Sequence, residues 1–100
     1  MIIEKPAIAG TLESSDVQVR IEPGNGTIEL DLSSSVMNQY GRQIKEQILK
    51  TLKRLEVDNA RLTVIDKGAL DCTIAARVEC AVFRSCGLSD QDVPWGGIVR

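Results

Sequence analysis

The chain contains no histidine, and this absence narrows the chemistry that it can perform. A catalytic serine needs a neighbouring general base, most often a histidine, to take its proton. In this chain only a lysine or a carboxylate is available for that role. The serines are therefore better interpreted as exposed hydroxyls that another enzyme modifies than as nucleophiles, and we expect no catalytic residue in the chain alone.

Aromatic residues, surplus charge and long apolar runs are also scarce. Only 3% of the residues are aromatic, and 12 basic against 14 acidic side chains leave a formal net charge of −2. Without a basic stripe interleaved with aromatic residues, the composition gives no support for nucleic-acid binding. No apolar run approaches the roughly 18 residues of a membrane span, and residues 1–5 lack the pattern of a signal peptide. We therefore expect a cytoplasmic protein without a membrane partner.

The three cysteines match no familiar spacing for zinc binding or thiol redox chemistry. Because the chain has neither histidine nor a C-x-x-C motif, we expect no metal site and reduced thiols. Cys72 and Cys80 fall in an alternating apolar series, where a free cysteine behaves as a small hydrophobic residue. Both are therefore expected in the core, whereas Cys86 lies near a polar tail and is left unassigned.

The first half of the chain contains two segments with the period of a half-buried strand. Residues 17–22 and 27–32 both alternate apolar and polar side chains. Pro23-Gly24-Asn25-Gly26 lies between them and is typical of a turn. The pattern predicts a β-hairpin of these two segments.

A long amphipathic helix is predicted next, from about Val36 to Leu55. Its apolar residues recur at steps of three and four, and Ser33-Ser34-Ser35 supplies hydroxyls that can cap its start. Residues 60–66 then alternate again and are predicted to form a strand.

The last periodic segment is open to two interpretations. Residues 70–80 alternate apolar and polar side chains, which favours a strand to about Glu79, although alanine and arginine are also good helix formers. Residues 80–86 are expected to form a short helix. The order of elements predicts one α+β domain over residues 1–100, with about four strands in an antiparallel sheet and the long helix packed across one face.

The segment Ala9-Gly10-Thr11-Leu12-Glu13-Ser14-Ser15-Asp16 carries the most informative serines. Small and polar residues around Ser14 are typical of an accessible turn that a modifying enzyme can reach. An ordinary surface loop is the alternative interpretation. A second informative segment lies later in the chain, at residues 66–72. Its sequence is Asp66-Lys67-Gly68-Ala69-Leu70-Asp71-Cys72.

These two blocks resemble the acyl carrier (gamma) subunit of bacterial citrate lyase. Residues 6–14 are similar to the amino-terminal motif of that family, and residues 66–72 to its most recognisable internal stretch, followed by Ala76-Arg77-Val78-Glu79. Both blocks occur in order and at fitting spacing, so the resemblance covers nearly the whole chain.

The resemblance implies a covalent cofactor on Ser14. In that family the matching serine carries 2'-(5''-phosphoribosyl)-3'-dephospho-coenzyme A through a phosphodiester bond, attached by a dedicated transferase. Ser15 stands where many relatives have glycine, which leaves a second, less favoured hydroxyl beside the first. Common acyl carrier proteins instead place their serine in Asp-Ser-Leu at a helix start, which is not found at Ser14.

The same resemblance implies a division of labour with larger partners. The alpha subunit, an acyl transferase, exchanges the acetyl group of the thioester for citryl, and the beta subunit, a citryl lyase, cleaves the product to oxaloacetate. The chain itself is then the tether and not the catalyst. Two alternatives remain: the carrier subunit of malonate decarboxylase, with a similar group and serine neighbourhood, and an interaction domain without a prosthetic group.

The final segment, residues 87–100, shows no clear periodicity and is interpreted as a flexible or docking tail. It contains Trp95, the only tryptophan of the chain. A lone tryptophan is a natural anchor for a partner pocket, and equally a large ring with which a small domain covers its core. Both roles stay open from the sequence.

Overall fold

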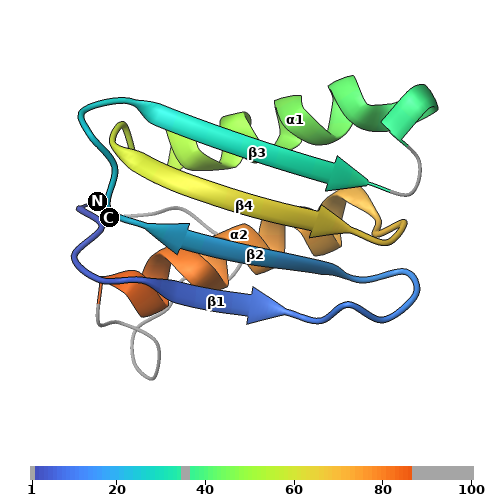
Figure 1. The fold of residues 1–100 in the computed structure, drawn as a ribbon, viewed down its shortest axis with the longest axis horizontal. Coiled ribbons are helices and arrows are strands. Elements are labelled where there is room, and N and C mark those ends of the chain that lie inside the picture. Colours follow the sequence, from blue (N-terminus) through green and yellow to red (C-terminus); the bar gives the residue numbers. More distant parts are fainter. Residues whose placement is uncertain (1, 35–36, 87–100) are drawn as a thin grey trace.

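The computed structural model describes residues 2–34 and 37–86, so the predicted tail and its Trp95 lie outside the described residues. These residues form four strands and two helices (Figure 1). In chain order the elements are β1 (Ala7–Gly10), β2 (Val17–Glu22), β3 (Ile28–Ser34), α1 (Met37–Arg54), β4 (Ala60–Asp66) and α2 (Asp71–Ser85).

The four strands form one mixed sheet in the order β1-β2-β4-β3. β2 is antiparallel to β1 and to β4, whereas β3 and β4 are parallel. The predicted hairpin of residues 17–22 and 27–32 is therefore wrong, because β4 lies between these two strands. The parallel pairing follows from the connection, since α1 crosses over between β3 and β4 and returns the chain to the same end of the sheet.

Both helices pack on one face of the sheet, α1 towards β3 and α2 across β1 and β2 (Figure 1). The predicted α+β class is confirmed, and the long helix lies where its apolar stripe predicted it. Buried Glu79 of α2 pairs with Arg54 of α1 and ties the two helices together. The buried apolar side chains of the described residues are Ile3, Ala9, Val17, Val19, Ile21, Ile44, Ile48, Leu52, Leu55, Val57, Ala60, Leu62, Val64, Ile74, Val78, Ala81, Val82 and Phe83.

The predicted strand at residues 70–79 is wrong, because this segment forms most of α2. Ile74, Val78 and Val82 are fully buried and recur every four residues, which is the period of a helix face. Cys72, expected in the core, is exposed, and Cys80 is half-buried. The apparent period of two came from small residues that fit either a strand or a helix. The fully buried residues of the segment lie on one face of a helix.

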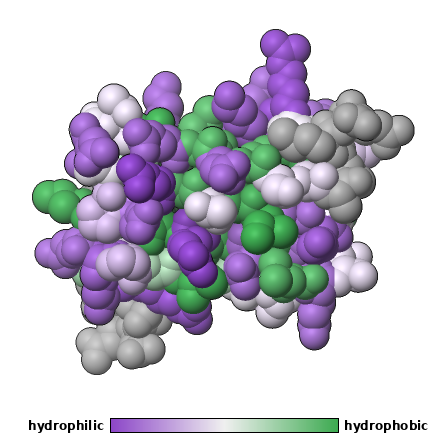
Figure 2. All heavy atoms as spheres, viewed as in Figure 1, coloured by the Kyte–Doolittle hydropathy of each residue, from purple (hydrophilic) through white to green (hydrophobic). Residues whose placement is uncertain are grey.

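The opposite face of the sheet carries mostly polar side chains. Figure 2 shows this face with hydrophilic residues spread across it and apolar ones between them. Arg61 of the central strand β4 lies between Glu29 of β3, at 2.9 Å, and Glu22 of β2, at 3.6 Å. This row of charges joins three neighbouring strands on the solvent side of the sheet.

Candidate functional site

Residues 11–16 connect β1 to β2 and contain both candidate serines. Ser14 and Ser15 are exposed, and within the described part of the chain the Ser14 hydroxyl has no hydrogen-bond partner. The amide of Ser15 donates to the carbonyl of Lys67 at 2.8 Å, and the amide of Lys67 donates to the carbonyl of Asp16 at 2.9 Å. These two bonds hold the serine loop against the turn after β4.

The two serines differ in backbone conformation. Ser15 has a φ of 65°, in the left-handed region that favours glycine. This geometry gives a physical reason for the expected glycine of relatives at this position, because glycine adopts it without the steric cost of a Cβ atom. Ser15 is thus held in the turn, and Ser14 stands before it with its side chain open to solvent.

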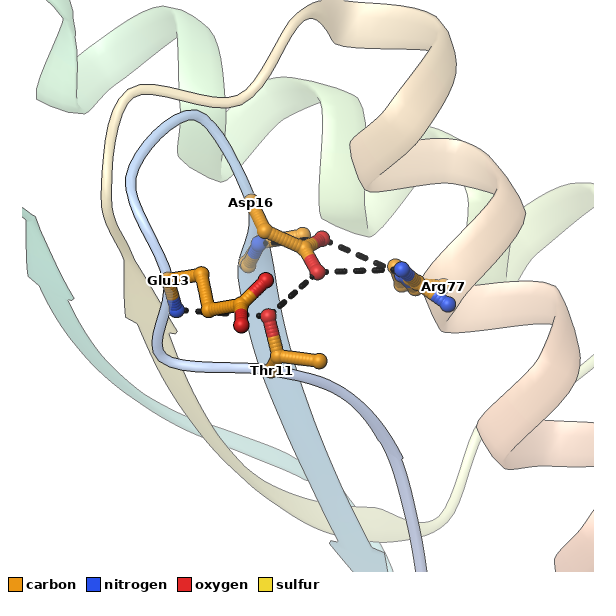
Figure 3. Close-up of polar contacts among 5 residues, drawn as sticks. Thr11, Glu13, Asp16 and Arg77 are labelled. Atoms are coloured by element: carbon orange, nitrogen blue, oxygen red, sulfur yellow. Dashed lines mark hydrogen bonds and ion pairs between the residues drawn. The ribbon is translucent and has the colours of Figure 1, made fainter.

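A clamp of three side chains, Thr11, Asp16 and Arg77, closes the loop (Figure 3). Arg77 of α2 donates from Nε and Nη2 to the two carboxylate oxygens of Asp16, at 3.1 and 3.0 Å. The hydroxyl of Thr11 donates to Asp16 Oδ2 at 2.6 Å and accepts the amide of Glu13 at 3.2 Å. The two ends of the loop and α2 are therefore fixed by one carboxylate.

The pKa of Asp16 is lowered by this clamp from its ordinary value of 3.8 to about 2. The hydrogen bond from Thr11 is the largest cause, followed by the hydrogen bond from Arg77. Both favour the charged form of the carboxylate. The Asp16 side chain is 15% exposed, so it forms this pair largely away from solvent.

We expect Asp16→Asn to lower the free energy of unfolding by about 1–2 kcal/mol at neutral pH, because it breaks the charged clamp. Since the pKa of Asp16 is lower in the folded state, its stabilisation is complete above about pH 4 and is lost as the pH falls towards 2. Urea unfolding of both proteins at several pH values measures this. The difference should shrink with falling pH.

The matched control is Glu13→Gln, which removes a charge from the same loop outside the clamp. It should leave stability within about 0.5 kcal/mol of the parent protein. An Asp16→Asn effect that stays constant from pH 7 to pH 2 would show that the carboxylate charge is not the source of the stabilisation.

Gly10, the last residue of β1, makes the close approach of the loop to β2 possible. Its φ is 89°, and a Cβ atom there would overlap the carbonyl oxygen of Val17 and lie 3.3 Å from Cδ of Arg77. Only a residue without a side chain fits this position. The loop geometry thus depends on a glycine before the loop as well as on the clamp that joins its two ends.

The turn after β4 is organised by the buried carboxylate of Asp66. Its oxygens accept the amides of Gly68 at 3.2 Å and Ala69 at 3.0 Å. They also accept the hydroxyl of Ser34, the last residue of β3, at 2.7 Å. The second of the two informative sequence blocks, residues 66–72, is therefore the structural support of the first.

Known proteins are similar in sequence to this chain over almost its full length. The chain is 54% identical over 96 residues to a citrate lyase acyl carrier protein of Vibrio cholerae serotype O1 (strain M66-2), which covers 95% of this chain and 96% of that protein. It is 48% identical over 91 residues to the Fusobacterium nucleatum subsp. nucleatum protein of the same name, covering 90% and 97%. The family model described as "Malonate decarboxylase delta subunit (MdcD)" matches residues 4–85. The chain belongs to the citrate lyase acyl carrier protein family.

The fold of this citrate lyase acyl carrier family member is also similar to a solved structure. A chain of a Pseudomonas malonate decarboxylase hetero-tetramer, crystallised in complex with malonate, matches with a TM-score of 0.56 at 18% identity, covering 85% of this chain and 92% of that one. At this identity the likeness concerns the fold alone.

Sequence reasoning located the serine loop of this family member but missed its clamp. Asp16 and Arg77 are 61 residues apart, and in the sequence neither can be distinguished from an ordinary charged surface residue. The one available indication was that Arg77 lies in a block similar to the family. No group of three or more potential metal ligands is found among the described residues, and neither of their helices is long and apolar enough to cross a membrane.

Proposed function

We propose that the chain is the acyl carrier subunit of a citrate lyase complex and that Ser14 is the attachment point of its prosthetic group. The observation that supports this most directly is the exposed Ser14 hydroxyl, without a hydrogen-bond partner among the described residues, in a loop clamped at both ends. An attaching enzyme needs an accessible hydroxyl on a defined backbone. The family membership supports the same role.

The residues present fit 2'-(5''-phosphoribosyl)-3'-dephospho-coenzyme A. A phosphodiester on Ser14 introduces a negative charge beside the exposed Glu13, whereas the other carboxylate of the loop, Asp16, is already paired with Arg77. Lys67 is exposed on the adjacent turn. When bound, the group supplies a terminal thiol that carries acyl groups. The chain's own residues hold the base of this arm in a fixed place, while chemistry is left to the partners.

The proposed partners are an alpha subunit with acyl transferase activity and a beta subunit with citryl lyase activity, together cleaving citrate to acetate and oxaloacetate. A dedicated transferase attaches the group, since the serine lies in a loop before a strand rather than at a helix start. A covalent tether keeps the acyl group at high effective concentration near both active sites. The complex is proposed to act in the cytoplasm.

Intact-mass measurement on protein purified from its native cells during growth on citrate tests the attachment. We expect the mass of the chain plus one prosthetic group, and fragmentation should place the phosphodiester on Ser14. A chain that is unmodified in an active complex would contradict the proposal and favour an interaction domain without a prosthetic group.

The carrier subunit of malonate decarboxylase is the second candidate, favoured by the description of the matching family. Reconstitution separates the two. The loaded chain should support cleavage of citrate with citrate lyase partners and should not support decarboxylation of malonate with malonate decarboxylase partners. The opposite result would assign it to the second complex.

A further inference from the structure

A cavity of about 530 Å³ lies between α1 and the segment that connects β4 to α2. Tyr40, Gln43 and Ile44 of α1 line one side, and residues 68–72 line the other. Figure 1 shows the serine loop, the turn after β4 and the first turns of α1 at the same end of the sheet. Because the amide of Ser15 binds the carbonyl of Lys67, the cavity begins one residue away from a direct contact of the loop.

The wall of the cavity is held in place before any ligand enters. The carboxylate of Asp66 binds the amides of Gly68 and Ala69, both of which line the cavity, and is itself buried. Ile44 anchors the opposite wall in the core, with 4% of its surface exposed. Cavities of a few hundred cubic ångströms with apolar walls and few polar groups are typical of small-molecule sites.

The residues that line the cavity favour some chemical groups over others. Tyr40 is 50% exposed and offers an aromatic ring for stacking, and Gln43 offers an amide that both donates and accepts hydrogen bonds. Asp71 is the one charged residue of the lining, and its carboxylate repels phosphate groups. An uncharged, flat heteroaromatic ring therefore fits, and a diphosphate does not.

We propose that the adenine and its ribose, within the prosthetic arm attached to Ser14, occupy this cavity against Tyr40. The assignment rests on the proposed function, and it divides the arm into two parts. The nucleoside part is docked on the carrier, and the diphosphate and the thiol-bearing chain extend into solvent. Docking at the base removes conformational freedom from the arm before it meets a partner, which lowers the entropic cost of binding there.

Proton NMR of the fully loaded chain tests the proposal. Adenine H2 and H8 should shift upfield, relative to the group released from the protein, because they lie over the Tyr40 ring. The shift should disappear in Tyr40→Ala. It should persist in Leu49→Ala, the matched control, since Leu49 is an exposed apolar residue of the same helix that does not line the cavity.

Intact mass of each sample separates this inference from the proposed function. A loaded wild-type chain whose adenine signals equal those of the released group overturns the docking alone, whatever the variants show. An upfield shift that survives in folded Tyr40→Ala also overturns it. If the dedicated transferase adds no group to Ser14, the proposed function fails and the docking fails with it. Circular dichroism verifies that each variant is folded.

Discussion

The Ser14→Ala chain is expected to take up no prosthetic group while keeping the fold of the parent. The substitution removes the single oxygen to which the phosphodiester would be attached. Because the side chain is exposed and has no hydrogen-bond partner in the described residues, its loss should change the free energy of unfolding by less than about 0.5 kcal/mol. Intact mass after co-expression with the dedicated transferase measures loading, and urea unfolding measures stability.

Ser15→Gly is the matched control for this experiment. Glycine adopts the left-handed backbone of this position readily, so the loop should keep its shape and loading should remain complete. The comparison is sharp because the two serines are adjacent and both are exposed. A phosphodiester mapped to Ser15 in either protein would reverse the assignment of the site.

Gly10→Ala is expected to destabilise the chain by more than about 4 kcal/mol, or to prevent folding. Two costs combine in this variant. The backbone φ of 89° is strained for alanine, and the new methyl group overlaps the carbonyl oxygen of Val17 and lies 2.9 Å from its carbonyl carbon. These atoms belong to the first residue of β2, whose side chain is fully buried, so they cannot move without disturbing the core.

Gly68→Ala isolates the first cost from the second. Gly68 has nearly the same φ, 90°, but nothing lies within 4 Å of the point that a Cβ atom would occupy there. It should lose only about 1–2 kcal/mol, the usual cost of a left-handed backbone. Thermal or urea unfolding of both variants measures the difference. Equal losses would show that the β1–β2 approach is not the constraint that the geometry indicates.

Local patterns predicted the elements that bury one clear face. The stripe of Ile44, Ile48, Leu52 and Leu55 combines steps of four and three, which fits a helix and not a strand, and β4 alternates with equal clarity. The part of α2 before residue 80 was assigned to a strand because Leu70, Cys72, Ala76 and Cys80 extended an apparent period of two, whereas a helix was predicted over residues 80–86. In the structure these four side chains are exposed or half-buried, so their spacing did not indicate which side of the segment faces the core.

The order of the strands in the sheet could not be predicted from local sequence patterns. The segment after β2 looked like the second half of a hairpin because a turn sequence separated the two strands. Nothing in either strand indicates that residues 60–66 will pair between them, since that choice depends on how α1 crosses the sheet. The same holds for the site: exposure of Ser14 follows from its neighbours, whereas the pairing of Asp16 with Arg77 arises only when α2 packs across β1 and β2.

The distance along the chain between the serine and its supports has a consequence for protein synthesis. Ser14 leaves the ribosome early, but the loop around it closes only when Lys67 has paired with Ser15 and when Arg77, 61 residues after Asp16, has reached that carboxylate. Until then the nascent chain presents the serine on an unshaped segment. On the proposed function, an attaching enzyme that recognises the closed loop would act only on chains that include residue 77, and translation products that stop before it would not consume the cofactor.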